Sequence, residues 1–286
     1  MSADHVIPFV FDALPVRGAL IHLSRSWRRM LRDHDYDPIV QETLGHAAAA
    51  TGLIAQSVKS DGAVTLQVQG SGDLRMLVMQ CTRELELRGM ATPAPAVNAG
   101  TFAQLMQDAH CAITVDRGER PYQGIVEINR ASLAASLENY FRRSVQVPSH
   151  VALVSNDNIA GGLLLQQMPG QMMDEDDWTR LGFLAETLQT NDFPGSDGLD
   201  LIGKLFNEDD VRVFNSREVL FRCRCSQQRA EEVLRMLGPE ETREALAQQE
   251  RIEVTCEYCG RRRNFDSVDV TRLFAENVVT GPDSVQ

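Results

Sequence analysis

Four of the chain's six cysteines form two short-spaced pairs near its end, and their spacing is suited to chemistry. Cys223 and Cys225 are separated by one residue, Cys256 and Cys259 by two, and Gly260 follows directly. Structural zinc is bound by four ligands, about 2.3 Å away when they are thiolates, usually delivered as two such pairs from two loops. Disulfides and a redox catalyst are the other chemistries open to these pairs, alone or in a combination that changes with conditions.

The sequence around the pairs favours zinc. The flanking stretches "FRCRCSQ" and "CEYCGRRR" are too polar for four buried, apolar cysteines. Neighbouring arginines lower the pKa of cysteine, which aids metal binding and also raises reactivity. We therefore predict one Zn²⁺ in the reduced protein, with these ligands: Cys223, Cys225, Cys256 and Cys259.

Two other functions remain open for the cysteines. A thioredoxin-like oxidoreductase would need "CEYC" at the start of a helix after a strand, and the first pair would then have no role. A zinc ribbon that binds nucleic acid is favoured by the arginines. The short Cys-x-Cys pair and the chain's formal net charge of -12 argue against it, because a binder that tracks phosphates needs a basic face.

Composition and the N-terminal residues indicate a cytoplasmic protein. With 286 residues, 43% hydrophobic and 24% charged, the chain has the composition of a soluble globular protein. Asp4 and His5 stand where a signal peptide would carry Lys or Arg, and Pro8 and Asp12 interrupt the apolar stretch. No stretch has the length of a membrane span. We expect no stable disulfides in that reducing compartment, and neither a membrane nor a nucleic-acid partner.

Residues 1–172 are expected to form a mixed α+β core domain. Residues 20–58 have the apolar spacing of helices, and residues 131–143 that of an amphipathic helix. Alternating residues around the Gly70-Ser71-Gly72 turn predict a hairpin of residues 64–68 and 74–81. "CAITVD" and "QGIVEI" predict a second strand pair.

Residues 173–222 differ in composition and are expected to form a linker of short helices. The stretch has two acidic runs and apolar residues at helical spacing, which are Trp178, Leu181, Leu184 and Leu188. Such a stripe is stable only when something covers it. The intervening "TNDFPGSDG" supplies turn residues and is expected to pack little. An ordinary surface helical segment is the alternative interpretation.

Residues 223–286 hold the cysteines in a small module. A strand over "VLFRCRC" leads to a helix capped by Ser226, a second helix opens at Pro239, and the strand "RIEVT" precedes the second pair. About sixty residues provide little hydrophobic stabilisation of their own. Loss of the metal should therefore unfold the module. Cys81 and Cys111, by contrast, are expected to be buried small hydrophobes.

Several blocks of the sequence resemble one known family. The pattern Cys-x-Cys-Ser, then Val-Thr-Cys-x-x-Cys-Gly and Phe265-Asp266, resembles the redox-switch domain of the 33 kDa chaperonins, which are redox-regulated heat-shock chaperones. The similarity extends through the chain in "VRGALIHL", "TLQVQGSG", "LRGMA", "YQGIVEI", "ENYF" and "GGLLLQQMPG". The sequence departs from the family pattern at Arg142, Arg143 and Val145, and an arginine replaces an aromatic residue after Cys-Gly.

The resemblance implies an ATP-independent holdase. It implies an α+β fold with an N-terminal α/β core domain, a helical linker and a small C-terminal zinc-binding redox-switch domain. It further implies that oxidation releases zinc, forms the disulfides Cys223–Cys225 and Cys256–Cys259, and unfolds the linker. Unfolding client proteins would then bind, commonly to a homodimer. In this interpretation the linker stripe acts as a latch, and the chain is not an enzyme.

Overall fold

The chain divides into two compact units, Met1–Arg222 and Cys223–Gln286, which we call the core unit and the cysteine unit. The computed structural model describes residues 4–58, 62–116, 118, 121–171, 173–193 and 198–275. Met172 and the Pro194-Gly195-Ser196 turn of the expected linker lie outside the described residues. The described residues of that linker, 173–193 and 198–222, belong to the core unit.

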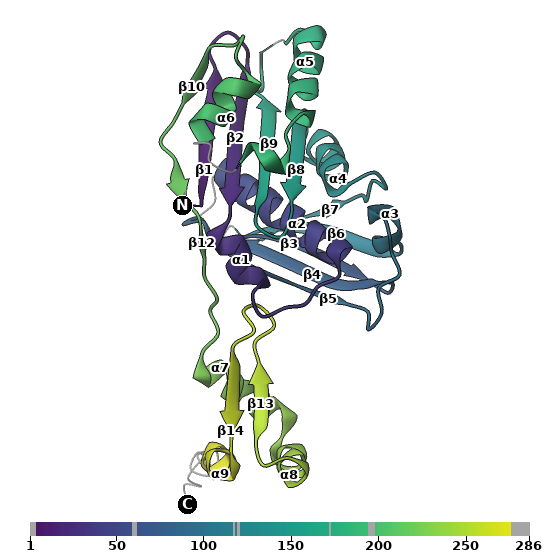
Figure 1. The fold of residues 1–286 in the computed structure, drawn as a ribbon, viewed down its shortest axis with the longest axis vertical. Coiled ribbons are helices and arrows are strands. Elements are labelled where there is room, and N and C mark those ends of the chain that lie inside the picture. The colour runs from purple at the N-terminus through teal and green to yellow at the C-terminus, as the bar shows by residue number, and fades with distance from the viewer. Residues whose placement is uncertain are drawn as a thin grey trace, which may run out of the picture. The chain divides into compact units, whose positions relative to one another are not determined.

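Two six-stranded sheets form the frame of the core unit (Figure 1). Its strands are β1 (His5–Phe11), β2 (Val16–Leu23), β3 (Val64–Gly70), β4 (Leu74–Cys81), β5 (Glu86–Pro93), β6 (Ala109–Val115), β7 (Tyr122–Val126), β8 (Ser149–Ser155), β9 (Ala160–Gln167), β10 (Val211–Val213), β11 (Arg217–Glu218) and β12 (Leu220–Phe221). Sheet A has the order β10-β1-β2-β9-β8, with β11 also paired to β1, and sheet B the order β12-β5-β4-β3-β6-β7. The β12–β5 pair is parallel.

The helices of the core unit pack between and against these sheets. They are α1 (Arg25–Leu31), α2 (Pro38–Ser57), α3 (Phe102–Leu105), α4 (Leu133–Tyr140), the π-helical turn η1 (Phe141–Val145), α5 (Glu175–Glu186), the 3₁₀ turn η2 (Thr190–Asp192) and α6 (Gly198–Leu205). Helix α2 begins at Pro38, where the Asp37 side chain accepts a hydrogen bond from the Ile39 amide. It contacts both sheets, and its buried run Ala47–Ala50 allows both to approach closely.

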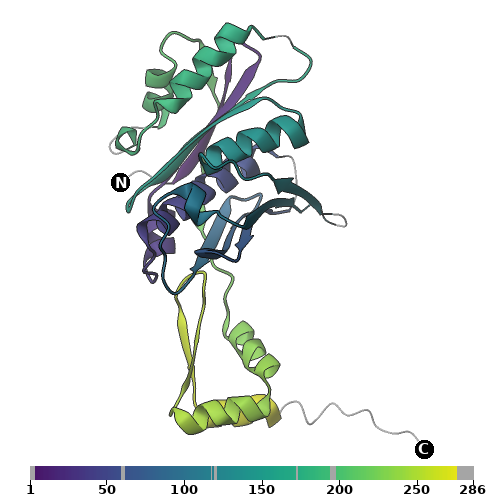
Figure 2. The ribbon, with the colours of Figure 1, turned by 90° about the vertical axis from the view of Figure 1, so that its right-hand side faces the viewer.

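Sheet A separates two hydrophobic clusters, because side chains alternate across a strand. Val6 faces the cluster that contains α2 and sheet B, whereas Ile7 and Phe9 face the cluster that contains α5 and α6. Figure 2 shows α5 and α6 on one side of sheet A. Residues of the expected linker therefore pack on one face of this sheet.

The α+β fold class is as predicted, but two predictions of secondary structure are wrong. The strand expected over "VLFRCRC" is only β12, Leu220–Phe221, which pairs with β5 in the core unit. Residues 20–23 are not helical, since they end strand β2 at the centre of sheet A. Seven of the eight residues of β2 are buried, so its apolar run lacks the alternation that marks a half-exposed strand. The predicted hairpin is β3–β4, the second strand pair is β6–β7, and the amphipathic helix is α4.

The cysteine unit is small and has a modest core. Its elements are α7 (Gln227–Leu237), α8 (Pro239–Gln248), β13 (Ile252–Thr255), β14 (Arg262–Phe265) and α9 (Ser267–Ala275). Ser226 caps α7 as predicted, and its hydroxyl accepts a hydrogen bond of 3.1 Å from the Arg229 amide. The buried hydrophobic residues of this core are Ala230, Leu234, Phe265, Val270 and Leu273.

Candidate metal centre

Two loops of the cysteine unit bring the four predicted ligands together. Cys223 and Cys225 lie in the extended segment that precedes α7, and Cys256 and Cys259 lie in the turn between the antiparallel strands β13 and β14. Their four Sγ atoms are all within 4.8 Å of one another. This convergence groups residues that are up to 36 positions apart in the chain.

The sulfur–sulfur distances suit a tetrahedral metal ion. Cys223 Sγ lies 3.6 Å from Cys256 Sγ, and Cys225 Sγ lies 3.5 Å from Cys259 Sγ. A tetrahedron with metal–sulfur bonds of about 2.3 Å has sulfur–sulfur edges of about 3.8 Å. All four residues are free cysteines in this structure. The donor set is therefore that of a four-thiolate metal site, and the residues present fit zinc.

The second pair, Cys256 and Cys259, lies in a tight turn that is closed by backbone hydrogen bonds. The Cys256 amide donates to the Arg261 carbonyl at 3.0 Å, and the Gly260 amide donates to the Cys256 carbonyl at 2.8 Å. Gly260 has a φ of 63°, in the left-handed region that glycine adopts without a steric penalty. The turn joins two strands and does not begin a helix, so the context required for a thioredoxin-like pair is missing.

Burial and hydrogen bonds shift the pKa values of Cys223, Cys225 and Cys259 in different directions. Burial raises the pKa of Cys223 far above its usual range and also raises the pKa of Cys259. Burial likewise opposes ionisation of Cys225, but contacts with the Cys259 thiol and the Arg263 guanidinium outweigh it and lower the pKa of Cys225 to about 7. Arg263 Nη1 lies 3.8 Å from Cys225 Sγ. A metal ion that binds here displaces the remaining thiol protons.

The two other cysteines belong to the core unit and are buried, as predicted. Cys81 ends strand β4 and Cys111 lies in β6, and both side chains are buried in the core unit. Burial raises the pKa of each thiol to about 12. A thiol that stays protonated at neutral pH is a poor nucleophile and a poor metal ligand.

Comparisons with known proteins agree with this geometry. The model of the Hsp33 protein family matches residues 4–266. The 33 kDa chaperonin of Nitrosococcus oceani is 41% identical over 278 residues, which cover 97% of this chain and 96% of that one. The 33 kDa chaperonin of Methylobacillus flagellatus is 37% identical over 289 residues, with 99% of each chain covered. The chain belongs to the Hsp33 family.

The fold is also that of a solved Hsp33 structure. The 33 kDa chaperonin (heat shock protein 33 homolog) of Thermotoga maritima matches with a TM-score of 0.80 and 23% sequence identity, over 96% of this chain and 99% of that one. Membership of the Hsp33 family identifies this protein as a chaperone. Among the residues that the structure describes, we find no helical segment with the length and hydropathy of a membrane span.

The apolar stripe of this Hsp33 protein lies against sheet A. Leu181 in α5 and Leu188 after it are buried, with 0% and 5% of their surface exposed. Trp178 and Leu184 are partly buried and pack against the same cluster. Trp178 also stacks on the His150 ring of β8, with centroids 4.2 Å apart. All four residues therefore pack on sheet A within the core unit, and their role as a latch stays a prediction.

Sequence reasoning missed one buried residue of this segment. Phe193, expected to pack little within "TNDFPGSDG", is only 2% exposed and belongs to the cluster beneath α5 and α6. Its ring packs over Gly161 of β9, where an added Cβ would lie 2.4 Å from Phe193 Cζ. The sequence signal for this burial was that Phe193 is a single aromatic residue among turn-forming residues. The glycine that receives it is far away in sequence.

The departures from the family pattern lie on the surface of the core unit. Arg142, Arg143 and Val145 belong to the exposed π-helical turn η1 after α4. Arg143 forms an ion pair with Glu127, and Arg142 hydrogen-bonds the Asn139 side chain. The side chains of Arg142, Arg143 and Val145 are exposed and do not belong to the hydrophobic clusters of the core unit.

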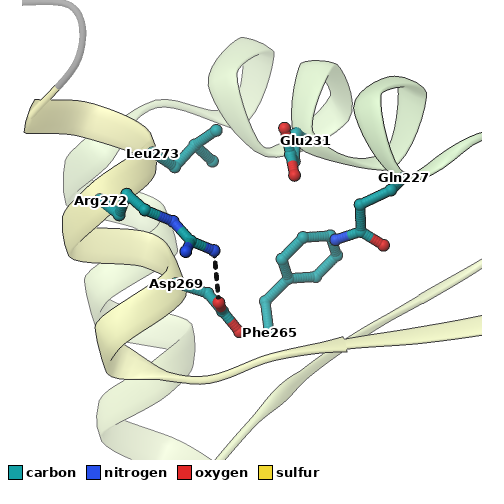
Figure 3. Close-up of a pocket in the computed structure, with 6 residues that line it drawn as sticks. All are labelled: Gln227, Glu231, Phe265, Asp269, Arg272 and Leu273. Atoms are coloured by element: carbon teal, nitrogen blue, oxygen red, sulfur yellow. Dashed lines mark hydrogen bonds and ion pairs between the residues drawn. The ribbon is translucent and has the colours of Figure 1, made fainter.

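A cavity of about 280 Å³ lies in the cysteine unit, apart from the sulfur cluster (Figure 3). Its lining residues are Gln227, Glu231, Phe265, Asp269, Arg272 and Leu273. Arg272 donates to Asp269 at 3.0 Å, so the two charges largely neutralise each other. Phe265 and Leu273 are core residues of the unit. The cavity is a gap between α7 and α9 whose charged groups are already paired.

Proposed function

We propose that this chaperone is a redox-regulated, ATP-independent holdase. The observation that carries the proposal is the convergence of the four thiols of Cys223, Cys225, Cys256 and Cys259 in a chain of the Hsp33 family. In the reduced state these thiolates hold one Zn²⁺. Oxidation releases the ion. The cysteine unit then loses its structure, and an apolar surface of the protein becomes exposed. The switch uses no nucleotide.

The small core of the cysteine unit supports a dependence on zinc. Five buried hydrophobic residues give this unit little stability by themselves. Structural zinc contributes on the order of 10–16 kcal/mol to the folding of small domains at neutral pH. Loss of the ion therefore removes most of the free energy that keeps this unit folded.

Oxidation is proposed to form the disulfides Cys223–Cys225 and Cys256–Cys259. In the reduced arrangement the closest thiol contacts run between the two pairs, from Cys223 to Cys256 and from Cys225 to Cys259. Pairing within each short loop thus replaces these contacts between the loops by bonds inside each loop. The two loops are then no longer held together by their thiols, and this loss is proposed to unfold the unit.

Residues 173–222 are proposed as the metastable linker between a client-binding core domain, residues 1–172, and the redox-switch domain, residues 223–286. With the switch domain unfolded, the linker leaves sheet A and uncovers the cluster that includes Ile7, Phe9 and Leu20. Unfolded or misfolded proteins bind there by apolar contact, and oxidised chains form a homodimer. We place the protein in the cytoplasm, where reduced thiols keep the switch closed.

One experiment on a single sample tests the proposal. Zinc content and suppression of thermal aggregation of a model client are measured on reduced protein, and again after oxidation. We expect one zinc per chain with little suppression before oxidation, and no zinc with strong suppression after it. Equal suppression in both states would contradict redox regulation. Aggregation that proceeds unchanged in both states would contradict the holdase itself.

A further inference from the structure

The linker supplies the two short strands that cover the outer edge of β1 in sheet A. Residues 9–11 of β1 lie opposite residues 211–213 of β10, and residues 5–6 lie opposite residues 217–218 of β11, both antiparallel. The inner edge of β1 pairs with β2. Within the described ranges, no strand other than β10 and β11 pairs with the outer edge. Release of the linker therefore leaves this edge without its partners.

Alternate residues of β1 direct their backbone groups to the linker. The Phe214 amide donates to the Pro8 carbonyl at 2.9 Å. The Asp12 amide donates to the Asp210 carbonyl, also at 2.9 Å. Val10 lies midway between Pro8 and Asp12, so its amide and carbonyl face β10 as well. A row of such groups, once uncovered, pairs readily with another extended chain.

The opposite edge of sheet A is protected by residues outside the linker. It is formed by β8, which contacts α4. The Val151 amide of β8 donates to Glu138 Oε1 of α4 at 2.8 Å. Because α4 lies within residues 1–172, this protection stays when the linker leaves. Of the two outer edges of sheet A, the linker strands therefore control the β1 edge.

A cavity of about 230 Å³ lies beside the β1 edge. Pro8, Val10 and Ala19 line it from sheet A, and Phe214 lines it from the linker. Phe214 thus adds a backbone hydrogen bond to the edge and a ring to the cavity, as one residue of an added strand does. When Phe214 leaves, the cavity opens to the edge and can receive an apolar side chain.

The other face of sheet A is also apolar at this edge. Phe9 and Phe11 belong to the cluster that contains α5 and α6, and release of the linker uncovers them. Side chains of a strand beside β1 alternate between the two faces. One set enters the cavity near Val10, and the other packs near Phe9 and Phe11. A segment that is apolar at successive positions fits both faces, and in a folded client such a segment is buried.

We propose that release of the linker opens β1 as a free sheet edge, and that an extended, apolar segment of an unfolded client binds there as an added antiparallel strand. In the reduced protein β10 and β11 occupy this edge and exclude the client. The proposal rests on the proposed function and names the group that is recognised, which is the client backbone. Backbone hydrogen bonds do not depend on sequence, so one edge serves many clients.

A second copy of this chain fits the edge less well than a client does. Pro8 has no amide hydrogen, so two paired β1 edges would each lack a donor. Asp12 forms an ion pair with Arg212 of β10, which departs with the linker. Two paired β1 strands would therefore carry two Asp12 carboxylates without this partner. An uncharged or basic client segment brings neither restriction.

Amide hydrogen exchange, resolved by residue in oxidised full-length protein, tests the edge. The probe is a short disordered peptide rich in Val and Phe, with Lys at both ends for solubility. We expect the amides of Val10 and Asp12 to lose protection on oxidation and to regain it at saturating peptide. The amides of Phe9 and Phe11 face β2 and should stay protected throughout. Bound peptide that leaves Val10 and Asp12 unprotected would overturn the proposal.

A depsipeptide separates recognition of the backbone from recognition of side chains. It has the same side chains as the probe, but esters replace its peptide bonds and remove the amide donors. Each lost hydrogen bond should raise the dissociation constant about twofold to tenfold. The depsipeptide should therefore bind oxidised protein at least about tenfold more weakly than the peptide. Equal affinity of the two probes would overturn recognition through the edge.

The variant Val10→Pro removes one outward amide from β1 and keeps an apolar side chain. In oxidised protein it should bind the peptide about twofold to tenfold more weakly. Phe214→Ala is the control, because it alters the linker strand and not the edge, and it should not weaken binding to oxidised protein. Unchanged affinity in Val10→Pro would overturn the edge. If this variant does not fold, the depsipeptide and the unaltered protein decide the question.

Aggregation assays on the oxidised samples keep the two proposals distinguishable. Suppression of aggregation without protection of Val10 by peptide would overturn the edge and leave the holdase supported. Protection of Val10 by peptide without suppression would contradict the holdase and leave the edge supported. Protection without peptide that rises with protein concentration would assign the edge to a second copy and overturn the proposal. Protection without peptide at every concentration would contradict release of the linker, on which both proposals rest.

Discussion

Cys225 Sγ and Cys259 Sγ lie 3.5 Å apart, although the two residues are 34 positions apart in the chain. A disulfide would bring two sulfur atoms to about 2.05 Å, whereas the edge of a zinc–thiolate tetrahedron is about 3.8 Å. The contact thus joins the two loops in the manner of a metal site. Removal of one side of this contact is the most direct way to test the centre.

The double variant Cys256→Ser/Cys259→Ser should lose all bound zinc. It removes two of four sulfur ligands from one loop, and the remaining pair cannot complete a tetrahedron. Metal analysis after purification under reductant should give one zinc per chain for the unaltered protein and none for the variant. Cys111→Ala, at a buried position in the core unit, is the matched control and should retain zinc. Undiminished zinc in the double variant would contradict the assignment.

Oxidation should leave Cys81 and Cys111 as thiols. Burial raises the pKa of both to about 12, so at neutral pH almost none of either is the reactive thiolate. Peptide mapping of oxidised protein should find the linkages Cys223–Cys225 and Cys256–Cys259 and two free core thiols. A dominant Cys225–Cys259 linkage would show instead that the disulfides form between loops that stay together.

His46 should make the core unit less stable in acid. Burial in α2 lowers its pKa from 6.5 to about 4, so the unfolded chain binds a proton more readily than the folded one between these values. Stability from this group is present above pH 6.5 and is lost as pH falls toward 4, by at most about 3 kcal/mol. Urea unfolding of His46→Gln should depend less on pH over this window.

Exposed His110 supplies the control for that measurement. His110→Gln should keep the pH dependence of the unaltered protein, since this side chain lies at the surface. An identical slope for His46→Gln and the unaltered protein would show that His46 does not titrate differently on folding.

The grouping of the four cysteines was predictable from sequence because their short spacing within each pair constrains it. Two pairs of cysteines leave few partners for each thiol, and Ser226 and Pro239 mark the helices that follow the first pair. Strand β2 was not predictable in the same way. Its residues are buried on both faces, so the burial pattern of Val16–Leu23 carries no period of two.

Long-range packing explains why the covered face of sheet A was missed. Phe193 is buried because Gly161, in another strand, leaves room for its ring. His5 of β1 likewise lies opposite His22 of β2 because of the register of these two strands, which neither local sequence reveals. Spacing in α5, by contrast, indicated correctly that Leu181 needs cover, since helical periodicity is a local property.

Polar substitution in the stripe should open the linker without oxidation. Leu181 is fully buried against sheet A, whereas its neighbour Phe183 on the same helix is 65% exposed. Loss of a buried leucine side chain costs about 2–5 kcal/mol, and a linker that opens at low cost has little stability to lose. Leu181→Ser should therefore weaken protection of α5 in reduced protein and give it some suppression of aggregation.

Phe183→Ser is the control that shows whether the effect of Leu181→Ser comes from the buried position of Leu181 or only from the added polar group. This substitution removes more apolar surface than Leu181→Ser does, and it lies on the same helix. The Phe183 side chain, however, is largely exposed and contributes little to the core. Hydrogen exchange of α5 should stay slow in Phe183→Ser and become fast in Leu181→Ser, with one zinc per chain in both. Because zinc remains bound in both variants, a gain of activity in Leu181→Ser alone would show that opening of the linker is sufficient for client binding. Opening of the linker would then be the step that follows zinc release. Equal exchange and equal activity in the two variants would remove the stripe from the mechanism.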